Sequence, residues 1–256
     1  MSISQANIQP IYPEKALISK FAPVLMVLVR PALAFAAQGI VVLLFMQFQI
    51  QSPTVAVRNW WTVYGTLVDI GCLALLFWLT KAEGINLFSL VSFDKRKLKK
   101  DIQIGVVIFL VVFPITVFGG SMLAGFLAYG KLQPDLPEGA FTRFLPLWGV
   151  LYSRLIWWPI WSFTEELTFQ GYSLPRLQAL TKKTWLSVLW VGFGWAVQHS
   201  FLPWINFQHG LFLFIMFVPL VIASQLIYLR LGRLMPMIIG HWLMDLFSVL
   251  FMVQVI

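Results

Sequence analysis

Apolar residues dominate this chain in long runs that polar segments separate. If a run of about 20 apolar residues is read as one helical membrane span, the pattern predicts seven spans. They cover roughly residues 21–48, 59–80, 103–128, 145–169, 185–201, 208–229 and 235–256. The longest polar segments are residues 81–102 and 130–143. The pattern therefore predicts an all-α, polytopic transmembrane helix bundle of about seven spans, with residues 1–256 forming a single membrane domain.

The composition agrees with a membrane protein. Hydrophobic residues make up 59% of the 256 positions, charged residues make up 11%, and the mean hydropathy is +0.83. A soluble domain of this length has too little interior for so much apolar surface, whereas lipid can solvate it. The single cysteine, Cys72, excludes an internal disulfide. The polar residues 1–7 lack a basic stretch before a short apolar run, so we expect no cleavable signal peptide.

The basic residues predict how the chain lies in the membrane. With seven spans, 13 of the 18 Lys and Arg residues fall on the side of the N-terminus. These residues are Lys15, Lys20, Lys81, Lys95, Arg96, Lys97, Lys99, Lys100, Arg176, Lys182, Lys183, Arg230 and Arg233. The opposite side holds Arg58, Lys131 and Arg143. The positive-inside rule then places the N-terminus in the cytoplasm, in what we expect to be a prokaryotic plasma membrane, and the net charge of +8 reports orientation and not a nucleic-acid partner.

Titratable residues inside the predicted spans are the candidates for chemistry. Glu165 and Glu166 are adjacent, His199 lies in the next span, and His241 and Asp245 lie one helical turn apart in the last. A charged side chain at the centre of a membrane helix costs on the order of 2.5–3.5 kcal/mol, so such residues usually have a function. A Glu that acts as general base, a His that orients a water, and a His with a polar neighbour that holds an oxyanion would suffice for peptide hydrolysis. We interpret the remaining histidine, His209, as structural.

Three motifs in this part of the chain resemble a known family. They are Glu165-Glu166-Leu-Thr-Phe-Gln170, Trp195-Ala-Val-Gln-His199 and His241-Trp-Leu-Met-Asp245. In order and rough spacing they are similar to the motifs of the CAAX-protease and bacteriocin-processing (CPBP, or Abi) intramembrane endopeptidases. The resemblance covers about residues 145–250, and the first three predicted spans carry no motif.

The resemblance implies a function and a role for each site residue. Glu165 would be the base that activates a water, His199 would assist it, His241 and Asp245 would stabilise the oxyanion, and Glu166 would support the site. Asp245 needs a proton to donate to an oxyanion, unlike the Asn that the family more often has there. The implied partners are a peptide or protein substrate and the lipid bilayer.

The expected chemistry uses no cofactor. A zinc site of the open catalytic type, built from Glu165, His199 and His241, is the alternative. The chain has no His-Glu-x-x-His run, and we favour the metal-free reading.

The chain departs from the family pattern at two positions. Trp195 replaces one aromatic residue, Phe, by another. Gln170 replaces an Arg that would lie four residues after Glu166 and offset its buried charge. Either another cation compensates, or the activity is reduced or lost.

Helix geometry adds predictions about position. Glu165 lies 17 residues before Lys182 and His199 lies 16 after Lys183, so a helical hairpin that turns at these lysines brings the two residues to one level. His241 reaches this level, with the site open to the cytoplasmic half, if the hairpin projects about 12 Å beyond the membrane.

Two further contacts between spans are predicted. Gly192, Gly194 and Ala196 predict a close helix approach just before His199. Arg30 and Asp69 lie at similar depth in the first two spans, which predicts a structural ion pair.

Two functions of other classes stay open at this point. The first is a catalytically inactive scaffold, immunity or binding module with the same fold, which the Gln170 departure favours. The second is a proton-coupled transporter with Asp69, Glu165 and Asp245 as relay groups, although the chain lacks the internal repeat that many transporters have.

Overall fold

The protein is almost entirely helical in a computed structural model that describes residues 17–137 and 139–256. The α-helices are α1 (Leu17–Gln47), α2 (Pro53–Ala56), α3 (Trp61–Ala82), α4 (Leu98–Val107), α5 (Phe113–Tyr129), α6 (Leu147–Tyr152), α7 (Trp158–Glu166), α8 (Leu174–Thr181), α9 (Thr184–Ser200), α10 (Phe207–Leu231) and α11 (Met235–Met252). The 3₁₀ turns are η1 (Val57–Trp60), η2 (Leu87–Val91) and η3 (Lys95–Lys97). The π-helical segments are η4 (Ile108–Val112), η5 (Ser153–Trp157) and η6 (Leu167–Ser173). The predicted all-α helix bundle is confirmed.

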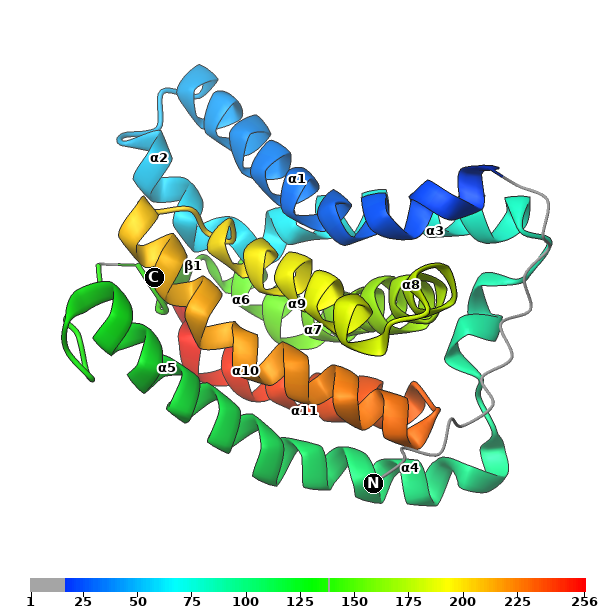
Figure 1. The fold of residues 1–256 in the computed structure, drawn as a ribbon. Helices are drawn as coiled ribbons and strands as arrows, with labels where there is room; N and C mark the ends of the chain where they lie inside the picture. The colour runs from blue at the N-terminus through cyan, green and yellow to red at the C-terminus, as the bar shows by residue number, and fades with distance from the viewer. Residues whose placement is uncertain (1–16, 138) are drawn as a thin grey trace.

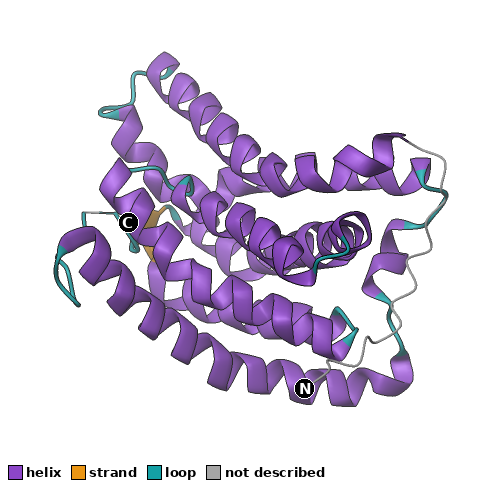
Figure 2. Ribbon diagram, viewed as in Figure 1, coloured by secondary structure: helices purple, strands orange, loops and turns teal. Residues whose placement is uncertain are grey.

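Strand structure within the described residues is limited to one short pair (Figure 2). Strand β1 (Arg143–Leu145) runs parallel to β2 (Val253–Val255), with Phe144 opposite Gln254. The pair joins the connection before α6 to the end of α11, so both ends of the family-like region meet there.

The motif-bearing helices occupy the middle of the bundle. In Figure 1, α1 crosses the top and the α4–α5 stretch runs along the bottom, with α7, α9, α10 and α11 between them. Helix α1 packs against α3 and α9, α5 packs along α10, and α11 packs against α4 and α7. Helices α1, α4 and α5 therefore flank the motif-bearing helices.

The number of membrane spans differs from the expectation. Five helical stretches of the described chain are long and apolar enough to cross a membrane: Lys20–Gln47, Pro53–Ala82, Leu87–Tyr129, Phe207–Leu231 and Met235–Met252. The other two predicted spans, 145–169 and 185–201, are helical but fall outside this set. Helix α9 has 17 residues, about 26 Å at the usual rise, which is shorter than a hydrocarbon core of about 30 Å. The count of seven is therefore not confirmed. The orientation stays a prediction, and Lys15 and residues 1–7 lie outside the described residues.

The surface is apolar and the interior holds charges, which is the distribution expected of an integral membrane protein. Phe21, Phe35 and Phe118 are exposed, whereas Arg30 and Glu165 are fully buried. Exposed apolar surface on this scale marks contact with lipid or with another protein.

Helix α9 approaches α1 closely, as its small residues predict. A Cβ at Gly194 would clash with the carbonyl oxygen of Val27, so any side chain there would force α1 and α9 to shift. The turn between α8 and α9 lies at Lys182, which adopts a left-handed conformation with a φ of 53°. The predicted hairpin is therefore formed, and it brings Gln198 near the end of α9 against Arg30 of α1, with a hydrogen bond of 2.8 Å between them.

Candidate active site

The predicted site residues come from three helices in the middle of the bundle. Glu165 and Glu166 end α7, where the π-helical segment η6 begins, and both are buried. His199 lies at the end of α9, and His241 and Asp245 lie on α11. A π segment inserts an extra residue into the helix and is frequent at functional sites.

The carboxylate of Glu165 is held by several donors. Trp195 Nε1 donates to Oε2 and Gln198 Nε2 donates to Oε1, both at 2.6 Å. Arg30 Nη2 lies 3.6 Å from Oε1, and His241 Nε2 lies 3.7 Å from Oε2. Hydrogen bonds to an ionised carboxylate are stronger than neutral ones, so this environment fixes the position of Glu165.

His241 is the point at which the first and third motifs meet. Its Nδ1 lies 3.0 Å from Glu166 Oε1, and its Nε2 lies 3.7 Å from Asp245 Oδ2 as well as from Glu165. The second oxygen of Glu166, Oε2, has no hydrogen-bond partner among the described residues. One imidazole thus lies between three carboxyl groups from two helices.

Asp245 is bonded to a residue that the sequence analysis did not select. Ser162 Oγ lies 2.5 Å from Asp245 Oδ2 and 2.9 Å from the carbonyl oxygen of Trp158. A hydroxyl has a single proton, so Ser162 can donate to only one of the two. Both bonds form at once only if Asp245 carries a proton and donates it to Ser162.

His199 faces the site from the other side. Its ring stacks on Phe217, with 3.7 Å between ring centroids and 9° between the planes. The imidazole of His199 also interacts electrostatically with the carboxylate of Glu165. The aromatic contact fixes the ring plane of His199.

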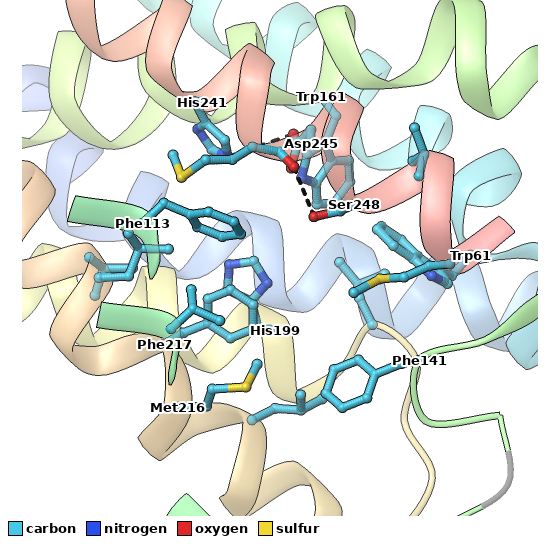
Figure 3. A pocket seen from close by; sticks show the side chains of 18 of the residues that line it. Trp61, Phe113, Phe141, Trp161, His199, Met216, Phe217, His241, Asp245 and Ser248 are labelled. Atoms are coloured by element: carbon cyan, nitrogen blue, oxygen red, sulfur yellow. Dashed lines mark hydrogen bonds and ion pairs between the residues drawn. The ribbon is translucent and has the colours of Figure 1, made fainter. Parts of the chain in front are cut away.

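A cavity of about 320 Å³ lies next to these residues. Glu166, His199, His241 and Asp245 line it, whereas Glu165 does not. Figure 3 shows His241, Asp245 and His199 around this space, with aromatic side chains such as Phe113 and Trp161 forming much of the wall. The expected convergence is therefore seen for three of the four residues placed in one cavity, and Glu165 lies behind them, drawn toward α1 and α9 by Arg30, Trp195 and Gln198.

The extent of the cavity also differs from the expectation. Phe141, Arg143 and Val253 belong to its wall. The predicted orientation places these residues on the side opposite the cytoplasm. The cavity therefore reaches the non-cytoplasmic side of that topology and is not confined to the cytoplasmic half.

The two departures from the family pattern have clear structural consequences. Trp195 stacks on Phe169, as a phenylalanine could, but its indole N–H also bonds to Glu165. Gln170 is fully buried and donates to Ser224 Oγ at 2.6 Å, not to Glu166. The expected pairing of positions 166 and 170 is wrong because residues 167–173 are π-helical, which changes the faces that residues four apart present. His241 is the partner of Glu166 instead.

Two contacts concern the remaining predictions. Arg30 Nη1 pairs with Asp69 Oδ1 at 3.0 Å, so the expected ion pair is confirmed. His209 is buried, stacks on Phe212, and is not part of the cavity wall.

The sequence analysis missed Gln198, Ser162 and the contact of Arg30 with Glu165. A signal was present for Gln198, which follows Trp195 by three residues and so shares its helix face. Ser162 similarly precedes Glu165 by three residues.

Within residues 17–137 and 139–256, no group of three or more His, Cys, Asp and Glu side chains has an arrangement that could hold a metal ion.

The region that holds all five predicted site residues matches a known protein family. Residues 145–247 match the family model described as type II CAAX prenyl endopeptidase Rce1-like. The resemblance to CAAX proteases is confirmed. The Rce1-like match supports an intramembrane endopeptidase activity, with a peptide or protein substrate in a lipid environment. No curated protein and no solved structure matches the chain.

Proposed function

We propose that the protein is an intramembrane endopeptidase of the CAAX-protease type that hydrolyses a peptide bond with a water activated by Glu165 and His199. The meeting of the first and third motifs at His241, with His199 of the second motif lining the same cavity, carries this proposal. Its ring nitrogens lie 3.0 Å from Glu166 and 3.7 Å from both Glu165 and Asp245. A site that combines a carboxylate base with donors for an oxyanion has what peptide hydrolysis requires.

The proposed reaction moves one proton from water to the leaving amine. Glu165 accepts this proton as the water oxygen attacks the peptide carbonyl carbon, and His199 orients the water. His241 carries both ring protons, so that Nδ1–H bonds to Glu166 while Nε2–H faces the developing oxyanion. Asp245 keeps its proton on Oδ1 and donates a hydrogen bond from it to the oxyanion, while the Ser162 hydroxyl donates to Asp245 Oδ2. Glu165 then returns its proton to the amide nitrogen as the carbon–nitrogen bond breaks.

The second carboxylate is a specific alternative as the base. Glu166 lines the cavity and its Oε2 is unpartnered among the described residues, whereas both oxygens of Glu165 already accept a hydrogen bond. Each carboxylate oxygen has two lone pairs, so Glu165 can still accept a proton from a water that enters beside His241.

Matched substitutions distinguish the two carboxylates. With a peptide that the wild type cleaves, Glu165→Gln should lower kcat by at least about 10²-fold, as expected for loss of a general base. Glu166→Gln removes only support for His241 and should lower kcat by about tenfold or less. The reverse order of effects would assign the base to Glu166.

A non-catalytic module with the same fold is the second candidate function. The Gln170–Ser224 bond in place of a charged pair, and the position of Glu165 behind the cavity wall, favour it. Such a module would bind a peptide or lipid in the cavity without turnover. It predicts that wild type and Glu165→Gln leave a peptide library equally intact.

The same proposal includes three further points. The reaction needs no metal, the N-terminus lies in the cytoplasm, and the membrane is a prokaryotic plasma membrane. The basic residues support the orientation.

A further inference from the structure

Arg30 is a fully buried cation that reaches the site from α1, outside the segment that matches the family. Its Nη1 lies 3.0 Å from Asp69 Oδ1, and its Nη2 lies 3.6 Å from Glu165 Oε1. The guanidinium also lies over the ring of Trp161, 4.3 Å from its centroid. An Arg stays protonated in proteins, so one permanent positive charge stands between two carboxylates.

Gln198 ties the same cation to the same carboxylate by a second route. Arg30 Nε donates to Gln198 Oε1 at 2.8 Å, and Gln198 Nε2 donates to Glu165 Oε1 at 2.6 Å. The amide oxygen must face the cation and the amide nitrogen must face the anion, so the charges at both ends fix its orientation. Glu165 is thus held by Arg30 directly and through Gln198.

The other ionisable groups around Glu165 do not replace Arg30. Those that face it are Asp69 and Cys72 on α3, Glu166 on α7, His199 on α9, and His241 and Asp245 on α11. They are carboxyl groups, imidazoles and a thiol, none of which carries a permanent positive charge. The imidazolium of His241 is bonded to Glu166 at 3.0 Å and lies farther, 3.7 Å, from Glu165. An ionised carboxylate buried without a cation is strongly unfavourable.

We propose that Arg30 is a positioning residue that keeps Glu165 ionised and in place, so that α1 completes the site. This inference rests on the proposed function, in which Glu165 is the base. Arg30 also supplies a compensating cation in place of the Arg that the family has at position 170. It comes from α1 and lies beside Glu165, not beside Glu166. Asp69 holds Arg30 and does not itself contact Glu165.

Turnover of matched variants tests this role. Arg30→Met keeps the apolar length of the side chain and should lower kcat by at least about 10²-fold with KM changed less than about threefold. Arg30→Lys restores the positive charge, and its kcat should be at least about tenfold higher than that of Arg30→Met. Asp69→Asn breaks the structural ion pair but keeps Arg30, and should leave kcat within about threefold. If Arg30 only stabilised the fold, Arg30→Met and Asp69→Asn would have the same effect on the kcat of the folded fraction, which would overturn the inference.

Two precautions keep the result interpretable. If Arg30→Met does not fold, the double variant Arg30→Met with Asp69→Asn removes both charges of the ion pair and is expected to fold with the same loss of kcat. Infrared spectroscopy gives a readout without turnover. Arg30→Met should gain a carbonyl stretch of a protonated carboxyl group that disappears when Glu165→Gln is added.

The outcomes separate this inference from the proposed function. An inactive wild type, or full activity in Glu165→Gln, contradicts the proposed function whatever Arg30 does. An active wild type with an inactive Glu165→Gln variant, but full kcat and no new carbonyl band in Arg30→Met, contradicts the role of Arg30 alone.

Discussion

The indole N–H of Trp195 should contribute measurably to stability through its bond to Glu165. Trp195→Phe keeps an aromatic ring against Phe169, where the ring centroids now lie 5.0 Å apart, and removes the donor that lies 2.6 Å from Glu165 Oε2. A hydrogen bond to a charged group contributes about 1.5–3 kcal/mol. We therefore expect the free energy of unfolding to fall by about that amount, measured by denaturant titration in mixed micelles with far-ultraviolet circular dichroism.

A second tryptophan on the same helix provides the control. Trp190 stacks on Phe193, with ring centroids 5.9 Å apart, and its Nε1 has no partner among the described residues. Trp190→Phe makes the same chemical change without losing a hydrogen bond, and should alter the unfolding free energy by about 0.5 kcal/mol or less.

A double-mutant cycle isolates the bond from the loss of ring volume. Combining Trp195→Phe with Glu165→Met should show a coupling energy of about 1.5–3 kcal/mol, because either single change already removes the interaction. A coupling energy below about 0.5 kcal/mol would refute the assigned hydrogen bond.

Three further predictions concern packing, the unusual glutamine and the metal. Gly194→Ala should lower the free energy of unfolding by about 1–3 kcal/mol, because the added Cβ meets the Val27 carbonyl. Gly39→Ala is the control and should not lower it, because no atom lies within 4 Å of the added Cβ. Equal unfolding free energies for the two variants would contradict the close α1–α9 approach. Gln170→Arg should destabilise the protein and lower peptide turnover, because position 170 is fully buried and faces Ser224, not Glu166, so the new charge has no carboxylate partner; unfolding free energy and turnover equal to those of wild type would contradict this placement. Exhaustive dialysis against a chelator should leave activity unchanged, because the proposed water activation uses a carboxylate and an imidazole; stoichiometric zinc whose removal abolishes activity and whose return restores it would overturn the metal-free proposal.

Sequence reasoning succeeded where spacing along a helix decides the contact. His241 and Asp245 are four residues apart on a regular α-helix, and their side chains approach to 3.7 Å. The Arg30–Asp69 pair followed from the depth of each residue in its span, and it forms at 3.0 Å. In both cases the helical rise and repeat contain enough information.

It failed where the helix departs from the regular repeat. The segment that follows Glu166 is π-helical, and its extra residue places Gln170 beside Ser224. Nothing in the residue types of this segment reveals the change in repeat. The sequence also could not show that Glu165, and not Glu166, lies behind the cavity. Adjacent residues on a helix point about 100° apart, and only the packed structure decides which of the two faces the open space.

It also failed where side-chain hydrogen bonds between helices decide the environment. Gln198 and Ser162 are ordinary polar residues in their sequence context, yet each bonds to a site carboxyl group. Their importance depends on the rotation of α7 and α9 about their axes. Apolar periodicity fixes that rotation too coarsely to predict a bond of 2.6 Å.

Cleavage of peptides by the purified full chain in lipid vesicles tests the central claim most directly. The measurement is the appearance of new peptide termini by mass spectrometry after incubation with a peptide library, for wild type and Glu165→Gln prepared in parallel. The account predicts defined cleavage products with wild type and a rate at least about 10²-fold lower with Glu165→Gln. Equal rates for the two proteins, or no cleavage by a folded wild type, would contradict it.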